Sequence, residues 1–106
     1  MDQYSCISVN QALELIEQGV AVADIRDPQN FQQGHMPGAV NLSNDNLHQF
    51  LTDADMDRPL IVCCYHGISS QPAAAYLVEQ GFETVYSMDG GFELWQATYP
   101  DKCARD

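Results

Sequence analysis

Short runs of consecutive apolar residues alternate along this chain with segments whose apolar residues recur at helical spacing, and this alternation constrains the fold most strongly. The clearest run is Leu60-Ile61-Val62-Cys63, and residues 20–23 form a second run within a strand predicted at residues 20–25. Strands that are apolar at every position are typical of parallel sheets, because helices cover both faces of such sheets. The sequence therefore predicts an α/β fold with a mostly parallel sheet.

Capping residues locate the first two predicted helices. Ser8 and Gln11 have the spacing of a capping box, which predicts that a helix begins at the next residue and runs to the glycine at position 19. Asp27 followed by Pro28 predicts a second, shorter helix, because aspartate is a good N-cap and proline is tolerated at the first helical position.

Three further helices are expected in the rest of the chain. Asn44 is expected to cap a helix whose apolar face holds Leu47, Phe50, Leu51 and Ala54. Another helix is expected to begin near Ser70, with Pro72 in its first turn. The last helix follows the turn at residues 89–91 and places on one face Phe92, Trp95 and Tyr99. Shorter strands are predicted at residues 6–8, 39–42 and 84–87.

The length of 106 residues predicts one domain over residues 1–106, with a core at about 7–97 and a loose polar tail at 100–106. The apolar runs are too short to span a bilayer, and the N-terminus lacks the pattern of a secretory signal, so we expect a cytoplasmic protein. Fifteen acidic residues against four Lys and Arg give a net charge of −11, which argues against nucleic-acid partners and anionic membranes.

The four cysteines are expected to be reduced thiols in a cytoplasmic protein. No pair has C-x-x-C spacing and the three histidines are scattered, so neither a metal site nor a cofactor is predicted. Cys63 and Cys64 are neighbours and should point to opposite faces of the sheet, with Cys63 a buried apolar residue. Cys6 and Cys103 are interpreted as incidental, with a resolving role for Cys103 left open.

Cys64 occupies the position at which this sequence most clearly predicts chemistry. It follows an apolar strand and begins a glycine-containing loop of residues 64–69 that leads into a helix. In α/β proteins ligands bind at this carboxyl edge of the sheet. Backbone N–H groups of such a loop and the helix N-terminus favour an anion, so we expect the pKa of Cys64 to fall below the free value of about 8.5.

The composition of the loop discriminates between the groups that such a thiolate can transfer. Cysteine phosphatases use a C-x5-R loop, whose arginine binds phosphate through a bidentate fork. Ser70 stands at the arginine position here, and the loop contains neither Lys nor Arg. The loop therefore disfavours phosphoryl transfer, whereas backbone amides alone suffice to hold a sulfur anion that is covalently attached.

Four ordered motifs carry a family resemblance: Asp24-Ile25-Arg26, Phe31-x-x-Gly34-His35-Met36-Pro37-Gly38-Ala39, the loop that begins at Cys64, and Gly90-Gly91-Phe92-x-x-Trp95. In order and spacing they resemble the rhodanese homology domain. This resemblance implies a single rhodanese-like domain, with five mostly parallel strands and helices on both faces of the sheet. It also implies a sulfurtransferase that moves sulfane sulfur from thiosulfate to a thiophilic acceptor, cyanide or a thioredoxin-like dithiol protein, and releases sulfite.

The resemblance also assigns roles to residues. Cys64 is implied to be the catalytic nucleophile that carries the sulfur as a persulfide, and the substrate-binding residues are implied to be Tyr65, His66, Gly67, Ile68, Ser69 and Ser70. Many rhodaneses have arginine directly after the cysteine and a basic residue late in the loop, where this chain has Tyr65 and Ser69. The Cys-Gly-Ser/Thr-Gly form associated with mercaptopyruvate sulfurtransferases is also missing, which argues against mercaptopyruvate as the donor.

Other interpretations stay open at this point. The domain can be a non-catalytic sulfur carrier or sensing module, or a redox protein in which Cys63 or Cys103 resolves an oxidised Cys64. His66 is either an exposed loop residue or an entrance group that attracts the donor. His35 is expected to have a structural role, and Arg26 is expected to bind acidic side chains rather than substrate.

Overall fold

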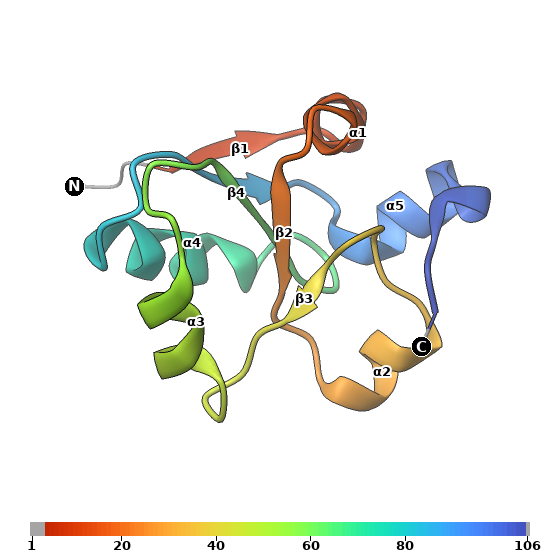
Figure 1. Cartoon of the computed structure of the whole chain (residues 1–106). Helices are drawn as coiled ribbons and strands as arrows, with labels where there is room; N and C mark the ends of the chain where they lie inside the picture. Colours follow the sequence, from red (N-terminus) through yellow and green to blue (C-terminus); the bar gives the residue numbers. More distant parts are fainter. Residues whose placement is uncertain (1–3, 106) are drawn as a thin grey trace.

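The computed structural model describes residues 4–105 and contains one sheet of five strands (Figure 1). Every pairing between adjacent strands is parallel, and the strands lie in the order β1-β5-β4-β2-β3. The predicted α/β class is confirmed. The strands are β1 (Ser5–Ile7), β2 (Ala21–Asp24), β3 (Val40–Asn41), β4 (Leu60–Cys63) and β5 (Val85–Met88).

Helices cover both faces of this sheet. One buried cluster packs α1 and α5 against one face, and a second cluster packs α3 and α4 against the other face. The short α2 lies beyond the carboxyl end of β2 (Figure 1). The helices are α1 (Val9–Glu17), α2 (Pro28–Gln33), α3 (Leu47–Asp53), α4 (Ser70–Glu79) and α5 (Gly91–Thr98), followed by a 3₁₀ turn (Pro100–Lys102).

The central strand β4 is buried along its whole length, as its continuous apolar run predicts. Because side chains alternate along a strand, Ile61 and Cys63 contact the layer of α1 and α5, whereas Leu60 and Val62 contact the layer of α3 and α4. The residue after the strand therefore starts on the side of α3 and α4. Because side chains alternate along the strand, Cys64 points toward the beginning of α4.

The predicted beginnings of the first two helices are confirmed. The Ser8 hydroxyl accepts a hydrogen bond from the N–H of Gln11, and the Gln11 side chain accepts one from the N–H of Ser8. Asp27 accepts from the N–H of Asn30, and Pro28 takes the first helical position. Both helices thus begin with their free N–H groups partly satisfied by side chains.

The predicted cap of the third helix is wrong. The helix begins at Leu47, and Asn44 lies in the preceding turn rather than at its N-cap. The side chain of Asn46 accepts a hydrogen bond from the N–H of Ser43 and donates one to the carbonyl of Asn41, each over 2.8 Å. These bonds close a turn that competes with earlier helix initiation, since asparagine side chains readily pair with nearby backbone.

The loose polar tail at 100–106 stays a prediction, but the part of it that the structure describes, up to Arg105, has partners elsewhere in the domain. His35 and Ala104 exchange two backbone hydrogen bonds of 2.9 and 2.8 Å, which form an antiparallel bridge. The indole N–H of Trp95 donates to the carbonyl of Lys102 over 3.3 Å. The polar composition of the tail did not reveal these backbone partners.

Within residues 4–105, no helix has both the length and the apolar character needed to cross a bilayer.

Candidate active site

The candidate site lies where the order of strands in the sheet reverses. From β2 the chain continues through α2 to the edge strand β3, whereas from β4 it continues through α4 to β5 on the other side. The carboxyl ends of β2 and β4 therefore flank the position at which open α/β sheets bind ligands. Cys64 is the first residue after β4, and the N–H of Ile25, after β2, donates to the carbonyl of Cys63 over 2.9 Å.

Backbone N–H groups surround the sulfur of Cys64. The N–H of Gly67 lies 3.1 Å from Cys64 Sγ, and the N–H of Ser70, the first residue of α4, lies 3.3 Å from it. We call the backbone of residues 65–70 around this atom the sulfur cradle. Both donors belong to a loop that leads into a helix N-terminus, an arrangement that favours negative charge.

The environment of Cys64 favours the thiolate. Burial raises its pKa, but hydrogen bonds from the Ser70 hydroxyl and from the N–H groups of Ser70, Gly67 and His66 lower it, and the net pKa lies below the ordinary value of a thiol. The predicted direction is confirmed. Burial raises the pKa of Cys63 well above that value, and the charge of Asp24 adds to the rise. Adjacent cysteines therefore have opposite ionisation behaviour.

The opposite placement of these cysteines bears on the redox interpretation. Cys63 belongs to the buried cluster between the sheet and the α1–α5 layer, and Cys103 packs against that same cluster. Cys64 Sγ lies on the other side, against the beginning of α4. This arrangement disfavours both Cys63 and Cys103 as partners for a disulfide with Cys64.

Gly67 allows the loop to turn back over the sulfur. Its φ of +83° lies in the left-handed region, and an added Cβ would lie 2.7 Å from the backbone nitrogen of Gly90 and 3.0 Å from the carbonyl of Met88. A side chain at this position would therefore suffer both backbone strain and a backbone clash. The positive φ and the close approach of neighbouring backbone therefore both favour glycine at this position.

The N-terminus of α5 holds the outer side of the loop. The N–H of Phe92 donates to the carbonyl of Cys64 over 2.8 Å, and the N–H of Glu93 donates to the carbonyl of Tyr65 over 3.1 Å. These bonds satisfy two N–H groups that a helix N-terminus leaves free. Because the loop carbonyls turn toward α5, the loop N–H groups are free to face the sulfur.

The side chains of the loop point away from the sulfur cradle. The Tyr65 hydroxyl donates to Asp27 and accepts from the side chain of Asn30 over 3.1 Å, which joins the loop to α2. His66 Nδ1 lies 3.6 Å from a carboxylate oxygen of Glu93, and both side chains are exposed. Ile68 is 73% exposed, whereas Ser70 is fully buried. Ser69 precedes α4 without capping it through its side chain.

Arg26 and His35 have structural positions, as predicted. The guanidinium of Arg26 pairs with Asp24 over 2.8 Å, donates to the carbonyl of Gly34 over 2.7 Å and lies 4.2 Å from the centre of the Phe92 ring. Arg26 is thus buried in an ion pair rather than directed at Cys64. His35 is buried and stacks on Phe31, with ring centres 4.0 Å apart.

Sequence reasoning missed Ser87, which contacts the site from β5. Its hydroxyl lies 2.8 Å from that of Ser70, and both residues are fully buried. The signal was present in the sequence, since a serine occupies an inward position of a predicted strand. Alternation alone, however, does not tell which residue on the facing helix meets it.

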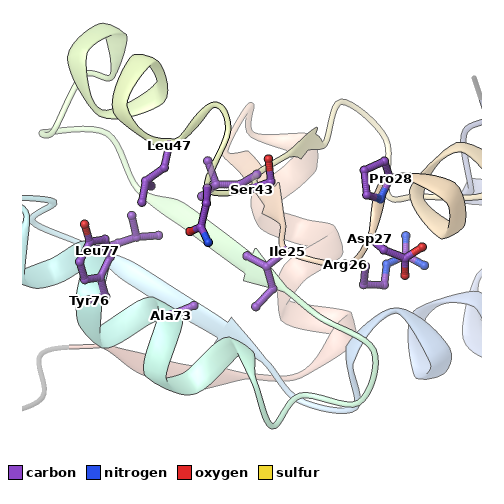
Figure 2. A pocket seen from close by; sticks show the side chains of 11 residues that line it. Ile25, Arg26, Asp27, Pro28, Ser43, Leu47, Ala73, Tyr76 and Leu77 are labelled. Carbon is purple, nitrogen blue, oxygen red and sulfur yellow. The ribbon is translucent and has the colours of Figure 1, made fainter.

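Two of the cavities lie at the carboxyl edge of the sheet, and Cys64 lines neither of them. The larger, of about 510 Å³, lies between α3, α4 and the carboxyl ends of β2 and β3, with mostly apolar walls that include Ile25, Leu47 and Leu77 (Figure 2). The smaller, of about 280 Å³, lies on the other side of the loop and has polar walls that include Asn30, His66 and Gln96. Within residues 4–105, no cluster of three or more His, Cys, Asp or Glu side chains has an arrangement that could hold a metal ion.

Comparison with known protein families shows to which family the chain belongs. Residues 8–98 match the rhodanese-like domain. The chain belongs to the rhodanese family. This match covers every strand except β1 and every helix from α1 to α5. The resemblance inferred from four sequence motifs is confirmed.

Individual relatives extend this assignment. The chain is 58% identical over 105 residues to the thiosulfate sulfurtransferase GlpE of Ectopseudomonas mendocina, with 99% of this chain and 96% of the relative aligned. It is 56% identical to the protein of the same name from Pseudomonas savastanoi pv. phaseolicola, over 96% of both chains. Among solved structures, reduced Bacillus anthracis CoADR-RHD is 26% identical with a TM-score of 0.82, over 95% of this chain and 18% of that one. The two GlpE proteins match this chain over almost their whole length, whereas the solved structure shares its fold over a part of a longer chain.

Proposed function

We propose that this protein is a thiosulfate sulfurtransferase in which Cys64 carries the transferred sulfur as a persulfide. One observation carries the proposal: Cys64 Sγ lies within 3.1 and 3.3 Å of two backbone N–H groups at the beginning of α4. This geometry supports a thiolate nucleophile and an anionic sulfur bound in the same place. The names of relatives more than half identical over nearly the whole chain support thiosulfate as the donor.

The first half-reaction forms the persulfide. The Cys64 thiolate attacks the outer sulfur of thiosulfate, and a new bond forms between Sγ and that sulfur. The sulfur–sulfur bond of thiosulfate breaks, and its electron pair leaves on sulfite. The negative charge of the enzyme moves from Sγ to the outer sulfur, for which the N–H groups of residues 65–69 are the proposed ligands.

The second half-reaction regenerates the thiolate. Cyanide, or one thiolate of a thioredoxin-like dithiol protein, attacks the outer sulfur. The bond between Sγ and that sulfur breaks, and its electron pair returns to Sγ. The products are thiocyanate or a persulfide on the acceptor, so both steps balance without a cofactor. The donors that hold the Sγ thiolate in the free enzyme also stabilise it as the leaving group.

Location and charge fit this proposal. We place the protein in the cytoplasm, where dithiol acceptors are kept reduced, and its four cysteines are free thiols. The loop has neither Lys nor Arg, and the net charge is −11, so neither nucleic acid nor a membrane surface is proposed as a partner. Binding of the donor then depends on short-range backbone dipoles rather than on basic side chains.

The test is intact-mass analysis after incubation with thiosulfate, followed by addition of cyanide. The protein should gain one sulfur atom, and cyanide should remove it with repeated turnover. Cys64→Ser should gain no sulfur, whereas Cys63→Ala, the adjacent cysteine on the opposite face, should behave like the unmodified protein. A stable persulfide without turnover would favour the sulfur carrier or sensing module, and sulfur on the Cys64→Ser variant would contradict the proposal.

A further inference from the structure

The side chain of Gln71 binds the loop that holds the sulfur. Gln71 lies in the first turn of α4, and its Nε2 donates to the carbonyl of Gly67 over 3.0 Å. Its Oε1 accepts from the hydroxyl of Tyr4 over 3.3 Å. A carbonyl can only accept, so the amide nitrogen must face Gly67, and the amide oxygen then faces a hydroxyl that donates. The direction of both hydrogen bonds is therefore determined.

The backbone around Gly67 turns its N–H groups toward one centre. Gly67 has a φ of +83°, whereas within residues 4–105 no residue other than glycine has a positive φ, so His66 and Ile68 on either side have negative values. Alternation of this kind gives an anion-binding nest of successive N–H groups. The N–H of Gly67 reaches Cys64 Sγ over 3.1 Å, which locates the centre of the nest at the sulfur.

The N–H of Ile68 is the donor of this nest that the protein itself does not use. Within residues 4–105 no group accepts from it, although the carbonyl of Ile68 accepts from the N–H of Gln71 over 3.2 Å. A backbone donor in a nest without a protein acceptor is available to a ligand. In the free enzyme Gly67 and Ser70 already bind Sγ, but the outer sulfur of a persulfide needs donors of its own.

The orientation of the Ile68 N–H depends on the carbonyl of Gly67, because both groups belong to one peptide unit. No peptide bond within residues 4–105 is cis, and in a trans peptide the carbonyl and the N–H point in opposite directions. Gln71 binds this carbonyl from a surface groove of about 490 Å³, which Tyr4 and Ile68 also line and Cys64 does not. The N–H is thereby turned away from the groove and into the nest.

We propose that Gln71 is a positioning residue for the persulfide: its side-chain amide binds the Gly67 carbonyl and so keeps the N–H of Ile68 directed at the outer sulfur. The proposal rests on the proposed function, in which this sulfur carries the negative charge after thiosulfate has reacted. Gln71 does not touch the substrate. It acts through the peptide unit between Gly67 and Ile68.

Other contacts hold the donors that bind Sγ itself. The Gly67 N–H belongs to the preceding peptide unit, and the backbone of Gly67 packs closely against that of Gly90. The Ser70 N–H lies at the beginning of α4. Neither contact involves the side chain of Gln71. Loss of this side chain should therefore destabilise the persulfide while leaving the free thiolate of Cys64 unchanged.

The test measures by intact mass the ratio of persulfide to free enzyme at a fixed ratio of thiosulfate to sulfite. Gln71→Met keeps the length of the side chain and removes both of its hydrogen bonds. The ratio of persulfide to free enzyme should fall about fivefold, because a hydrogen bond to the charged outer sulfur loses its alignment. Gln80→Met makes the same change at the exposed C-cap of α4, and this matched control should leave the ratio unchanged.

Alkylation of the free enzyme by iodoacetamide separates positioning from a general disturbance of the loop. Gln71→Met should alkylate at Cys64 as fast as the unmodified protein, because Gly67 and Ser70 still bind Sγ. A parallel loss in alkylation and in persulfide, or an unchanged persulfide ratio, would overturn the proposal. If Gln71→Met does not fold, Gln71→Ala, which suits a helix, should give the same separation, and the same two outcomes would count against the role.

Tyr4→Phe tests the other end of the bridge. It removes the hydroxyl that orients the amide and should lower the persulfide ratio about twofold. In a Gln71→Met background it should cause no further change, because the amide through which it acts is gone. An equal effect in both backgrounds, or none in either, would remove Tyr4 from the bridge.

The two proposals fail in different ways. A failure of the unmodified protein to gain sulfur from thiosulfate would refute the proposed function. A persulfide that forms in the unmodified protein and is equally populated in the Gln71 variants would refute only the positioning role.

Discussion

The N–H of Phe92 donates to the carbonyl oxygen of Cys64 over 2.8 Å, which connects the first turn of α5 to the residue that holds the reactive sulfur. This bond orients the peptide between Cys64 and Tyr65 with its carbonyl toward α5. The following N–H groups are then available on the side of the sulfur. A helix N-terminus thus acts on the site indirectly, by holding the loop in the conformation that binds an anion.

The two adjacent cysteines should differ completely in function. Cys64→Ser should abolish transfer of sulfur from thiosulfate to cyanide, because it removes the thiolate held by Gly67 and Ser70. Cys63→Ala should retain most of the activity, because its side chain packs into the opposite layer. The check is thiocyanate formation under saturating thiosulfate, and substantial activity of the Cys64→Ser variant would refute the mechanism.

Gly67→Ala should reduce transfer at least tenfold, because the new Cβ would lie 2.7 Å from the nitrogen of Gly90 and the loop must move away from the sulfur. Gly38→Ala is a matched control, since Gly38 also has a positive φ, +72°, but has no atom within 4 Å of an added Cβ. Both variants carry backbone strain of about 1–2 kcal/mol. Equal activities in the two variants would show that strain, rather than the shape of the sulfur cradle, causes the loss.

The reactivity of Cys64 should persist to lower pH than that of an ordinary thiol. Its pKa is lowered because hydrogen bonds to the thiolate outweigh burial, so the reactive form is present above the lowered pKa and is lost as the pH falls through it. Alkylation of Cys64 should therefore reach half its maximal rate at a lower pH than alkylation of an ordinary thiol does. Burial raises the pKa of Cys103, so its peptide should show the opposite displacement in the same experiment.

Asp24→Asn should destabilise the protein strongly, because it leaves the buried guanidinium of Arg26 without its counter-charge. Removal of one partner of a buried ion pair typically costs about 3–5 kcal/mol. Asp55→Asn breaks an exposed pair with Arg58, of 3.7 Å, and should leave the free energy of unfolding almost unchanged. Urea unfolding of both variants tests this contrast, and similar midpoints would contradict it.

Salt should accelerate the reaction with thiosulfate. The net charge of −11 repels a dianion at long range, and salt screens this repulsion with a Debye length of about 8 Å at physiological ionic strength. The N–H groups of the sulfur cradle act at contact distance and are screened less. We expect kcat/KM for thiosulfate to rise modestly between low and moderate ionic strength, whereas alkylation by neutral iodoacetamide should barely change. A steep fall with salt would indicate a positive entrance formed by His66, Arg26 or another cation.

Much of the fold was predictable because its signals are local. The apolar run of β4 required burial on both faces, and the capping box of Ser8 and Gln11 marked the beginning of α1. The position of Cys64 between a buried strand and a helix indicated a thiolate at the edge of a parallel sheet. Each of these inferences depends on residues within one turn or one strand, where backbone geometry relates spacing directly to structure.

Other features depended on contacts between residues far apart in the chain. Ser87 meets Ser70 only because β5 lies next to β4 and α4 packs on that side of the sheet. The bridge between His35 and Ala104 holds a tail whose composition predicted a loose segment. The sequence by itself thus determined the elements, the parallel class of the sheet and which cysteine ends a strand. The tertiary structure decided which groups surround its sulfur, because hydrogen bonds across the fold depend on strand order and helix packing, which local patterns do not encode.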